Sequence, residues 1–212
     1  MNFEQIQQNR FEIKRENIVP LSELPQKLSP KLKSLGWPLE CQGSGRLLED
    51  GKNFQIRYPK GDLFYSWTVI IHELGHLRQD EFSEAIKKET DEHKDNLARE
   101  KDAPIRGLER IKKYYPDILD KLESEFSKLK REDKIPNFNS FLELYQDFND
   151  NNISINETLG VEDDPEVIYQ KLKAINISDF FGRIEKNKAN IKIDTQEAED
   201  IIFKITNDIV KE

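Results

Sequence analysis

The sequence contains little cysteine and little histidine, and it lacks any long apolar run. The single cysteine, Cys41, excludes an internal disulfide framework and fits a reducing compartment. No stretch approaches the ~18 consecutive apolar residues that a membrane span needs, and the first residues lack the apolar core of a signal peptide. We therefore expect a cytoplasmic protein that does not interact with a membrane.

An excess of basic residues is also missing. Asp and Glu number 41 against 33 Lys and Arg, which gives a formal net charge of −8. Nucleic-acid-binding domains usually carry a basic surface, so we expect no direct contact with nucleic acid. Hydrophobic residues make up 36% and charged residues 35% of the 212 positions. This composition predicts a small hydrophobic core and a heavily charged surface. It does not predict the oligomeric state.

The residue patterns predict an α+β fold that is mostly α. Between Gly45 and Tyr58, two short runs flank Asp50-Gly51, a good tight-turn dipeptide, and the second run alternates polar and apolar residues, so a β-hairpin is expected there. A long helix should begin after Asp62, which can act as its N-cap. We expect three regions, namely an N-terminal docking segment at 1–40, a catalytic core at 41–104 and a helical C-terminal region at 105–212.

Prolines and polar runs predict where the later helices end. Asp102-Ala103-Pro104 should end a helix over 82–102, and a long charged helix should follow from 105 to 131. The Asn- and Asp-rich run at 149–164 is predicted to be a connector. It would lie among shorter helices near 138–148, 165–175 and 195–210.

The chain has only three histidines, and two of them belong to one motif, His72-Glu73-Leu74-Gly75-His76. On a helix, positions i and i+4 lie about 40° apart around the axis and about 6 Å apart along it. His72 and His76 can therefore reach one metal ion. In zinc hydrolases the glutamate of such an HExxH motif takes a proton from water, whose pKa the metal lowers towards neutrality. We therefore expect Zn²⁺ as the cofactor, His72 and His76 as metal ligands and Glu73 as the catalytic base and acid.

The helix around this motif has two different faces. Gly75 costs up to ~1 kcal/mol of helix stability relative to alanine, but it allows a neighbouring element to come close beside the metal face. The alternative is a helical scaffold in which both histidines are ordinary helix residues. The apolar side is formed by Leu63, Trp67, Ile70, Leu74 and Leu77.

The motif, which follows the apolar run at 67–71, resembles the active-site helix of the zincin metallopeptidases. Among these, it is most similar to the ImmA/IrrE-type intracellular peptidases, and the resemblance covers residues 45–100. It implies a zincin-like core and a zinc-dependent metalloprotease that hydrolyses an intracellular protein or peptide. The subfamily is associated with cleavage of transcriptional regulators. The resemblance also implies that the strand at 54–58 pairs with an extended substrate peptide.

A catalytic zinc ion needs a third protein ligand, and the sequence leaves its identity open. ImmA/IrrE-like proteins share a downstream E-x-E-A-D-x-F-A pattern whose first Glu is a ligand, and the best register here places Asp91 at that position. The helical wheel of residues 82–100 favours His93 instead, because His93 lies on the face that also carries Leu97 and Glu100. We take His93 as the third ligand. The alternatives are Asp91, then Glu89 or Glu92, and then a later residue such as Glu109.

Any of these choices requires the chain to turn between Leu77 and Ser83. In one unbroken helix, His93 would lie about 25 Å from His76.

Tyr58 or Tyr65 is a candidate for stabilising the oxyanion of the reaction. The alternative to an endopeptidase is a catalytically inactive zincin-like module that binds a partner protein, with the C-terminal helices as the interaction surface.

Overall fold

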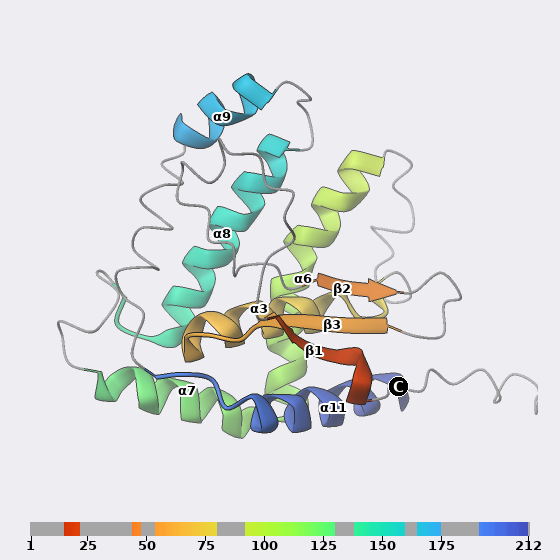
Figure 1. The fold of residues 1–212 in the computed structure, drawn as a ribbon, viewed down its shortest axis with the longest axis vertical. Coiled ribbons are helices and arrows are strands. Elements are labelled where there is room, and N and C mark those ends of the chain that lie inside the picture. Colours follow the sequence, from red (N-terminus) through yellow and green to blue (C-terminus); the bar gives the residue numbers. More distant parts are fainter. Residues whose placement is uncertain are drawn as a thin grey trace, which may run out of the picture.

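The computed structural model describes residues 15–21, 44–47, 54–79, 92–129, 138–159, 165–174 and 191–211. Within these ranges the chain is α+β and mostly helical, as predicted (Figure 1). The extended elements, after a short 3₁₀ helix η2 (Arg15–Asn17), are β1 (Ile18–Leu21), β2 (Ser44–Leu47) and β3 (Phe54–Pro59). The helices are α3 (Leu63–His76), α6 (Glu92–Tyr114), α7 (Pro116–Lys128), α8 (Phe141–Leu159), α9 (Pro165–Ala174) and α11 (Thr195–Lys211).

The strands form one three-stranded sheet in the order β1-β3-β2. β2 and β3 are antiparallel, with Gly45 opposite Ile56, which confirms the predicted pairing of these two runs. β1 pairs with β3 in parallel, with Ile18 opposite Ile56. The N-terminal segment thus contributes an edge strand to the sheet.

The central place of β3 corrects one expectation. The strand predicted to pair with a substrate peptide is hydrogen-bonded on both sides, to β1 and to β2. β2 pairs with β3 from Phe54 to Arg57, and β1 pairs with it from Ile56 to Pro59, so each side of β3 is occupied over four of its six residues. A peptide could therefore pair along the whole of β3 only by displacing β1 or β2.

Helix α3 is the buried centre of the molecule. Its N-cap is Asp62, as predicted, whose Oδ1 accepts hydrogen bonds from the backbone N–H groups of Phe64 and Tyr65, each at 3.0 Å. The helix ends at His76, and Arg78 follows with φ = 49°, a conformation that non-glycine residues rarely adopt. The predicted turn after Leu77 is confirmed. The whole predicted apolar face of α3 is buried, namely Leu63, Trp67, Ile70, Leu74 and Leu77.

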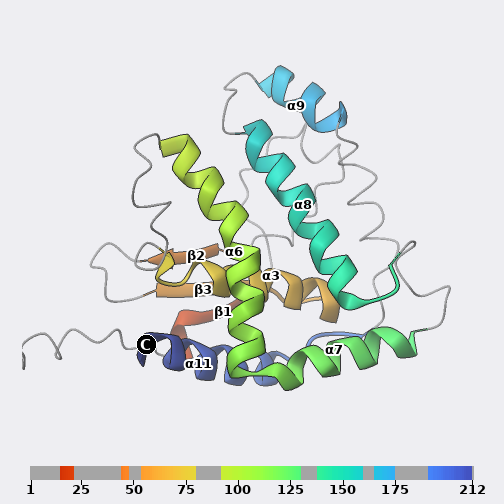
Figure 2. The same cartoon turned by 180° about the vertical axis from the view of Figure 1, so that it is seen from behind.

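Helix α6 crosses α3 at very close range, as the view from behind shows (Figure 2). A Cβ built on Gly75 would lie 1.9 Å from the carbonyl oxygen of Ala103, and one built on Gly107 would lie 1.9 Å from that of Ile71. The absence of side chains at these two glycines is therefore what permits the approach. The predicted close neighbour beside Gly75 is α6.

The predicted helix break at Pro104 is wrong. Pro104 lies inside α6, which runs across the predicted boundary at 104. A helical proline lacks the N–H that would bond the carbonyl four residues earlier, here that of Glu100. The helix continues because it is held on both sides. α3 packs against Ala103 and Gly107, and the Tyr145 hydroxyl of α8 donates to the Pro104 carbonyl oxygen at 2.8 Å.

The break lies instead at Tyr115, so the predicted single helix over 105–131 is two helices. Pro116 is the first residue of α7, a position that proline favours because the first helical N–H has no partner inside the helix. The predicted connector at 149–164 is also corrected, since α8 continues to Leu159. Residues 149–159 therefore belong to a helix.

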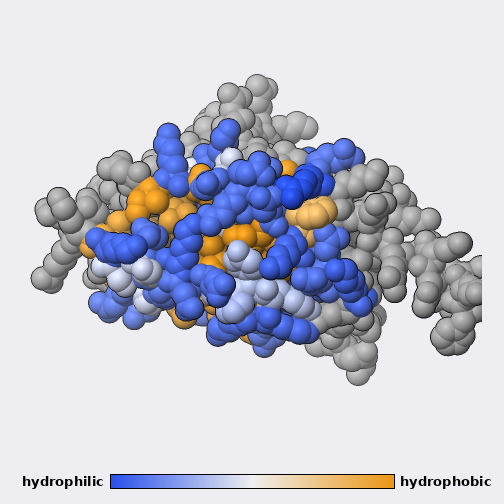
Figure 3. Space-filling model, turned by 90° about the horizontal axis from the view of Figure 1, so that it is seen from below, coloured by the Kyte–Doolittle hydropathy of each residue, from blue (hydrophilic) through white to orange (hydrophobic). Residues whose placement is uncertain are grey.

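Helices α7 and α11 form the lower layer of the molecule in the orientation of Figure 1. The face that they present is mostly hydrophilic, with small hydrophobic areas between the charged side chains (Figure 3). Lys121 of α7 and Glu197 of α11 form an ion pair at 2.6 Å across this layer. Among the described helices, none combines the length and the apolar character that crossing a bilayer requires.

Candidate metal centre

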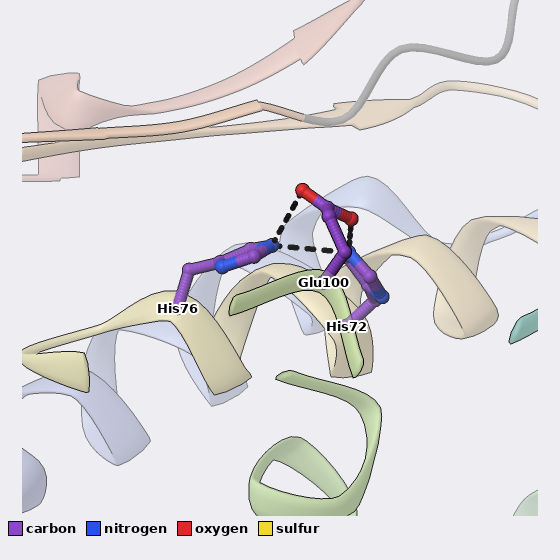
Figure 4. Close-up of side chains that lie close together, drawn as sticks. All are labelled: His72, His76 and Glu100. Carbon is purple, nitrogen blue, oxygen red and sulfur yellow. Dashed lines mark hydrogen bonds and ion pairs between the residues drawn. The ribbon is translucent and has the colours of Figure 1, made fainter. Parts of the chain in front are cut away.

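Three side chains converge at the crossing of α3 and α6. They are His72 and His76 from α3 and Glu100 from α6, and their potential ligand atoms all lie within 4.8 Å of one another (Figure 4). The Nε2 atoms of the two histidines are 3.1 Å apart. Glu100 places Oε2 3.1 Å from Nε2 of His72 and Oε1 3.6 Å from Nε2 of His76. One helix thus supplies the predicted histidine pair, and a second helix supplies a carboxylate.

The far side of the His72 ring is held by Asn149 of α8. Nδ1 of His72 lies 3.2 Å from Oδ1 of Asn149. The amide Nδ2 of Asn149 donates to the carbonyl oxygen of Tyr145 at 2.7 Å, so its Oδ1 is the atom left to accept. In its neutral form, His72 would therefore carry its proton on Nδ1 and direct the lone pair of Nε2 to the cluster.

The His76 ring is held in the same way by a different amide. Its Nδ1 lies 3.1 Å from Oε1 of Gln79, just beyond the end of α3. The Nε2 group of Gln79 donates to the carbonyl oxygen of Arg99 at 2.9 Å and to Asp102 at 2.7 Å. The oxygen of Gln79 is therefore the acceptor for Nδ1 of His76, and Nε2 of His76 faces the cluster.

These two hydrogen bonds leave the cluster short of positive charge. Two imidazole lone pairs face each other at 3.1 Å, and a carboxylate lies beside them. Such a set of donors is stable only with a proton or a cation among them, because the lone pairs otherwise repel. The arrangement is that of a metal-ligand set in which other side chains orient the ligands.

The electrostatics of His72 and Glu100 reflect this pairing. Burial acts to lower the pKa of His72, but the hydrogen bond to Glu100 and the charges of Glu73 and Glu100 raise it above its ordinary value. Burial acts to raise the pKa of Glu100, but the contacts with His72, His76 and Asn152 hold it below its ordinary value. Without a cation, His72 and Glu100 thus favour an imidazolium–carboxylate pair.

The end of α3 is held by a buried arginine. Arg110 of α6 is 7% exposed and donates hydrogen bonds to the carbonyl oxygens of Leu74, Gly75 and Leu77, the latter two at 3.1 Å and 2.6 Å. These carbonyls have few partners inside the helix because they lie in its last turn. A guanidinium also interacts favourably with the negative end of the helix dipole. Arg110 thus fixes the turn that carries His76.

Glu73 is placed beside the cluster and is not one of its three members. It is 6% exposed and follows His72 on α3, and its charge contributes to the raised pKa of His72. Glu73 thus lies close to the cluster without belonging to it, and its role as catalytic base and acid stays a prediction. Tyr58 does not meet its prediction, because its hydroxyl contacts the carbonyl oxygen of Thr195 on α11 at 3.4 Å. Tyr65 packs edge-on against Phe148 of α8.

The sequence favoured His93 as the third ligand, whereas Glu100 fills this position among the described side chains. His93 lies in α6, seven residues before Glu100 and about 10 Å from it along the helix axis. The side chains of His93 and Glu92 fall outside the described residues, as do Asp91 and Glu89 entirely. Glu109 is exposed and is not part of the cluster.

Glu100 and Asn149 were both missed from the sequence, and only Glu100 had a signal there. Glu100 lies on the predicted inward face of its helix, and it precedes Ala103 and Gly107 by three and seven residues, which is one helical face. Small residues on that face mark where a glycine-bearing helix such as α3 can approach. Asn149 had no comparable signal, because its run of Asn and Asp has the composition of a turn.

Comparison of the chain with protein-family models, with curated proteins and with solved structures finds no match in any of the three. The geometry of the site is therefore the basis for proposing a function.

Proposed function

We propose that this chain is a zinc-dependent endopeptidase of zincin type that hydrolyses an intracellular protein substrate. One observation carries the proposal. An HExxH helix presents the Nε2 atoms of two imidazoles 3.1 Å apart, and a carboxylate from a second helix completes a three-donor set. Two histidines and one glutamate are a ligand set that catalytic zinc sites use.

The distances support zinc in this set. Tetrahedral zinc with bonds of about 2.0–2.2 Å holds neighbouring ligand atoms about 3.3–3.6 Å apart. Here the two Nε2 atoms are 3.1 Å apart, and with one ligand atom taken from each residue the three atoms lie within 4.8 Å of one another, which places all three within reach of one ion. A set of three protein ligands also leaves the fourth position for water or substrate, which distinguishes catalytic from structural zinc sites.

Each residue of the site would then have its own role in the reaction. Zinc, when bound, lowers the pKa of water and polarises the carbonyl of the scissile bond. Glu73 accepts the proton that the attacking water loses and returns it to the leaving amine. The buried position of Glu73, at 6% exposure, keeps its carboxylate beside the cluster and limits competition from bulk water. His72, His76 and Glu100 hold the ion, and Asn149 and Gln79 keep the two rings in one tautomer.

The substrate would add to the sheet at β2. This strand pairs with β3 and with no other described strand, and it is the edge of the sheet towards the first half of α6, which carries Glu100 (Figures 1 and 2). The other edge strand, β1, packs against α11. An extended peptide that pairs with β2 would gain main-chain hydrogen bonds largely independent of its sequence.

The first test is metal content together with the Glu73→Gln variant. We expect about one zinc per chain in protein purified without chelators, and cleavage of a peptide library derived from a cell lysate, read by mass spectrometry of the new termini. Glu73→Gln should keep the zinc and lose about 10²–10⁴-fold in rate. Absence of zinc would overturn the proposal, and so would cleavage that Glu73→Gln leaves intact. Zinc without any cleavage by the wild-type protein would favour the inactive, partner-binding module.

A further inference from the structure

Two asparagines of helix α8 contact two different members of the metal-ligand set. Asn149 accepts from Nδ1 of His72, and Asn152 donates through Nδ2 to Oε2 of Glu100 at 3.1 Å. Their spacing of three residues places them on one face of α8. From these contacts we propose that Asn149 and Asn152 are positioning residues of the metal centre, so that the C-terminal helix α8 is part of the site. The inference rests on the proposed function only in requiring a bound divalent cation.

Asn149 controls the tautomer of His72. The side chain is 2% exposed, and its amide is oriented by donating to Tyr145 in the preceding turn of α8. With Nδ1–H of His72 directed to this oxygen, Nε2 remains the metal-binding atom. Without the acceptor, the buried Nδ1–H would lose its partner, and the ring would be free to change tautomer or rotate.

Asn152 controls the carboxylate of Glu100. Oε2 of Glu100 lies between two nitrogens, Nε2 of His72 and Nδ2 of Asn152, each at 3.1 Å. The amide donor thus restrains the carboxylate through the same oxygen that contacts His72. It adds no charge, so it does not compete with the cation as a lysine or an arginine would.

The position of α8 relative to α6 is itself fixed near the site. The Tyr145 hydroxyl donates to the Pro104 carbonyl oxygen, and Lys101 of α6 pairs with Glu157 of α8 at 2.9 Å. These contacts lie on either side of the two asparagines along α8. A catalytic core that ended at residue 104 would therefore lack the contacts that orient two of its three ligands.

Alanine substitutions of single asparagines test the proposal, with affinity for Zn²⁺ measured by competition against a chromophoric chelator. Asn149→Ala and Asn152→Ala should each weaken binding by about 10–100-fold, the usual effect of losing a residue that orients a metal ligand. Asn151→Ala is the matched control. It lies between them on α8, and its amide donates to Asp147 of the same helix at 2.7 Å, so its affinity should stay within about threefold of wild type.

Two further measurements separate positioning from folding. The visible absorption of the Co²⁺-loaded protein should change for Asn149→Ala and Asn152→Ala and should match wild type for Asn151→Ala. Asn149→Asp keeps an acceptor oxygen and should bind Zn²⁺ at least as tightly as wild type. Wild-type affinity and spectra for both alanine variants would overturn the inference, as would a folded Asn149→Asp that binds as weakly as Asn149→Ala. A wild-type protein that binds neither metal would instead overturn the proposed function.

Discussion

Gly75 and Gly107 lie back to back where α3 crosses α6. A Cβ on Gly75 would lie 1.9 Å from the carbonyl oxygen of Ala103, and a Cβ on Gly107 would lie 1.9 Å from that of Ile71 and 3.3 Å from the backbone nitrogen of Gly75. Each contact is with backbone, which cannot move without shifting a helix. Because Glu100 is one turn before Ala103, the same approach brings Glu100 to His72 and His76.

Gly75→Ala should therefore weaken both folding and metal binding. Alanine would favour an isolated helix by up to ~1 kcal/mol, but separating two packed helices costs about 1–3 kcal/mol or more. We expect a lower midpoint of thermal unfolding and a loss of Zn²⁺ affinity. Gly107→Ala should lower the unfolding midpoint and the Zn²⁺ affinity in the same way. Ser124→Ala, at an exposed position of α7, should change neither. Calorimetry with and without Zn²⁺ measures both effects, and a more stable Gly75→Ala protein would show that the crossing is not this close.

Glu100, not His93, should be the third ligand in solution. Glu100→Gln keeps the shape of the side chain but removes the charge that balances the cation, so Zn²⁺ affinity should fall by at least ~100-fold. His93→Gln should bind within about threefold of wild type, and Glu109→Gln, an exposed site on the same helix, is the control. The chelator competition assay decides between them, because loss of zinc in His93→Gln with retention in Glu100→Gln would reinstate the choice made from sequence.

The stability of the metal-free protein should depend on pH through His72 and Glu100. The pKa of His72 is raised above its ordinary value of 6.5, so its protonated form contributes stability below that value, and the contribution is lost as the pH rises through the raised pKa. The pKa of Glu100 is lowered from 4.5, so its contribution is present above 4.5 and is lost at lower pH. The pair should therefore be most stabilising between these two values.

Zinc should reverse this trend, because it binds the deprotonated imidazole. Thermal unfolding from pH 5.5 to 7.5 should show metal-free protein losing stability at the upper end, while the stabilisation by Zn²⁺ grows. Glu100→Gln, which lacks the partner of His72, should show a smaller loss in the metal-free state. A metal-free wild-type protein that follows the same pH profile as Glu100→Gln would contradict the assignment of the pair.

The sequence predicts those parts of the site that depend on local geometry. His72 and His76 are paired by the helical repeat alone, and Asp62 caps the helix that carries them. The antiparallel pairing of β2 with β3 follows likewise from two short runs around a turn. These features involve residues close in the chain, so few alternative arrangements compete with them.

Proline shows the limit of such local rules. Pro104 lies within a helix and Pro116 begins one, the reverse of what was predicted from the sequence. The intrinsic cost of an internal proline is about 3 kcal/mol, and contacts from α3 and α8 on both sides of Pro104 offset it. Intrinsic helix propensity therefore decides where a helix ends only where tertiary packing contributes less free energy than the propensity does.

By itself, therefore, the sequence determined an HExxH motif, with two histidines and an adjacent glutamate, on a helix with one apolar face. Only the tertiary structure decided what completes it. Glu100 is 24 positions beyond His76 (100 − 76) and Asn149 is 77 positions beyond His72. Their places depend on how α6 crosses α3 at two glycines and on how α8 packs against α6. The distances of Glu100 and Asn149 from the two histidines are set by side-chain volume and by backbone contact between helices. The spacing of residues along a single helix does not encode them.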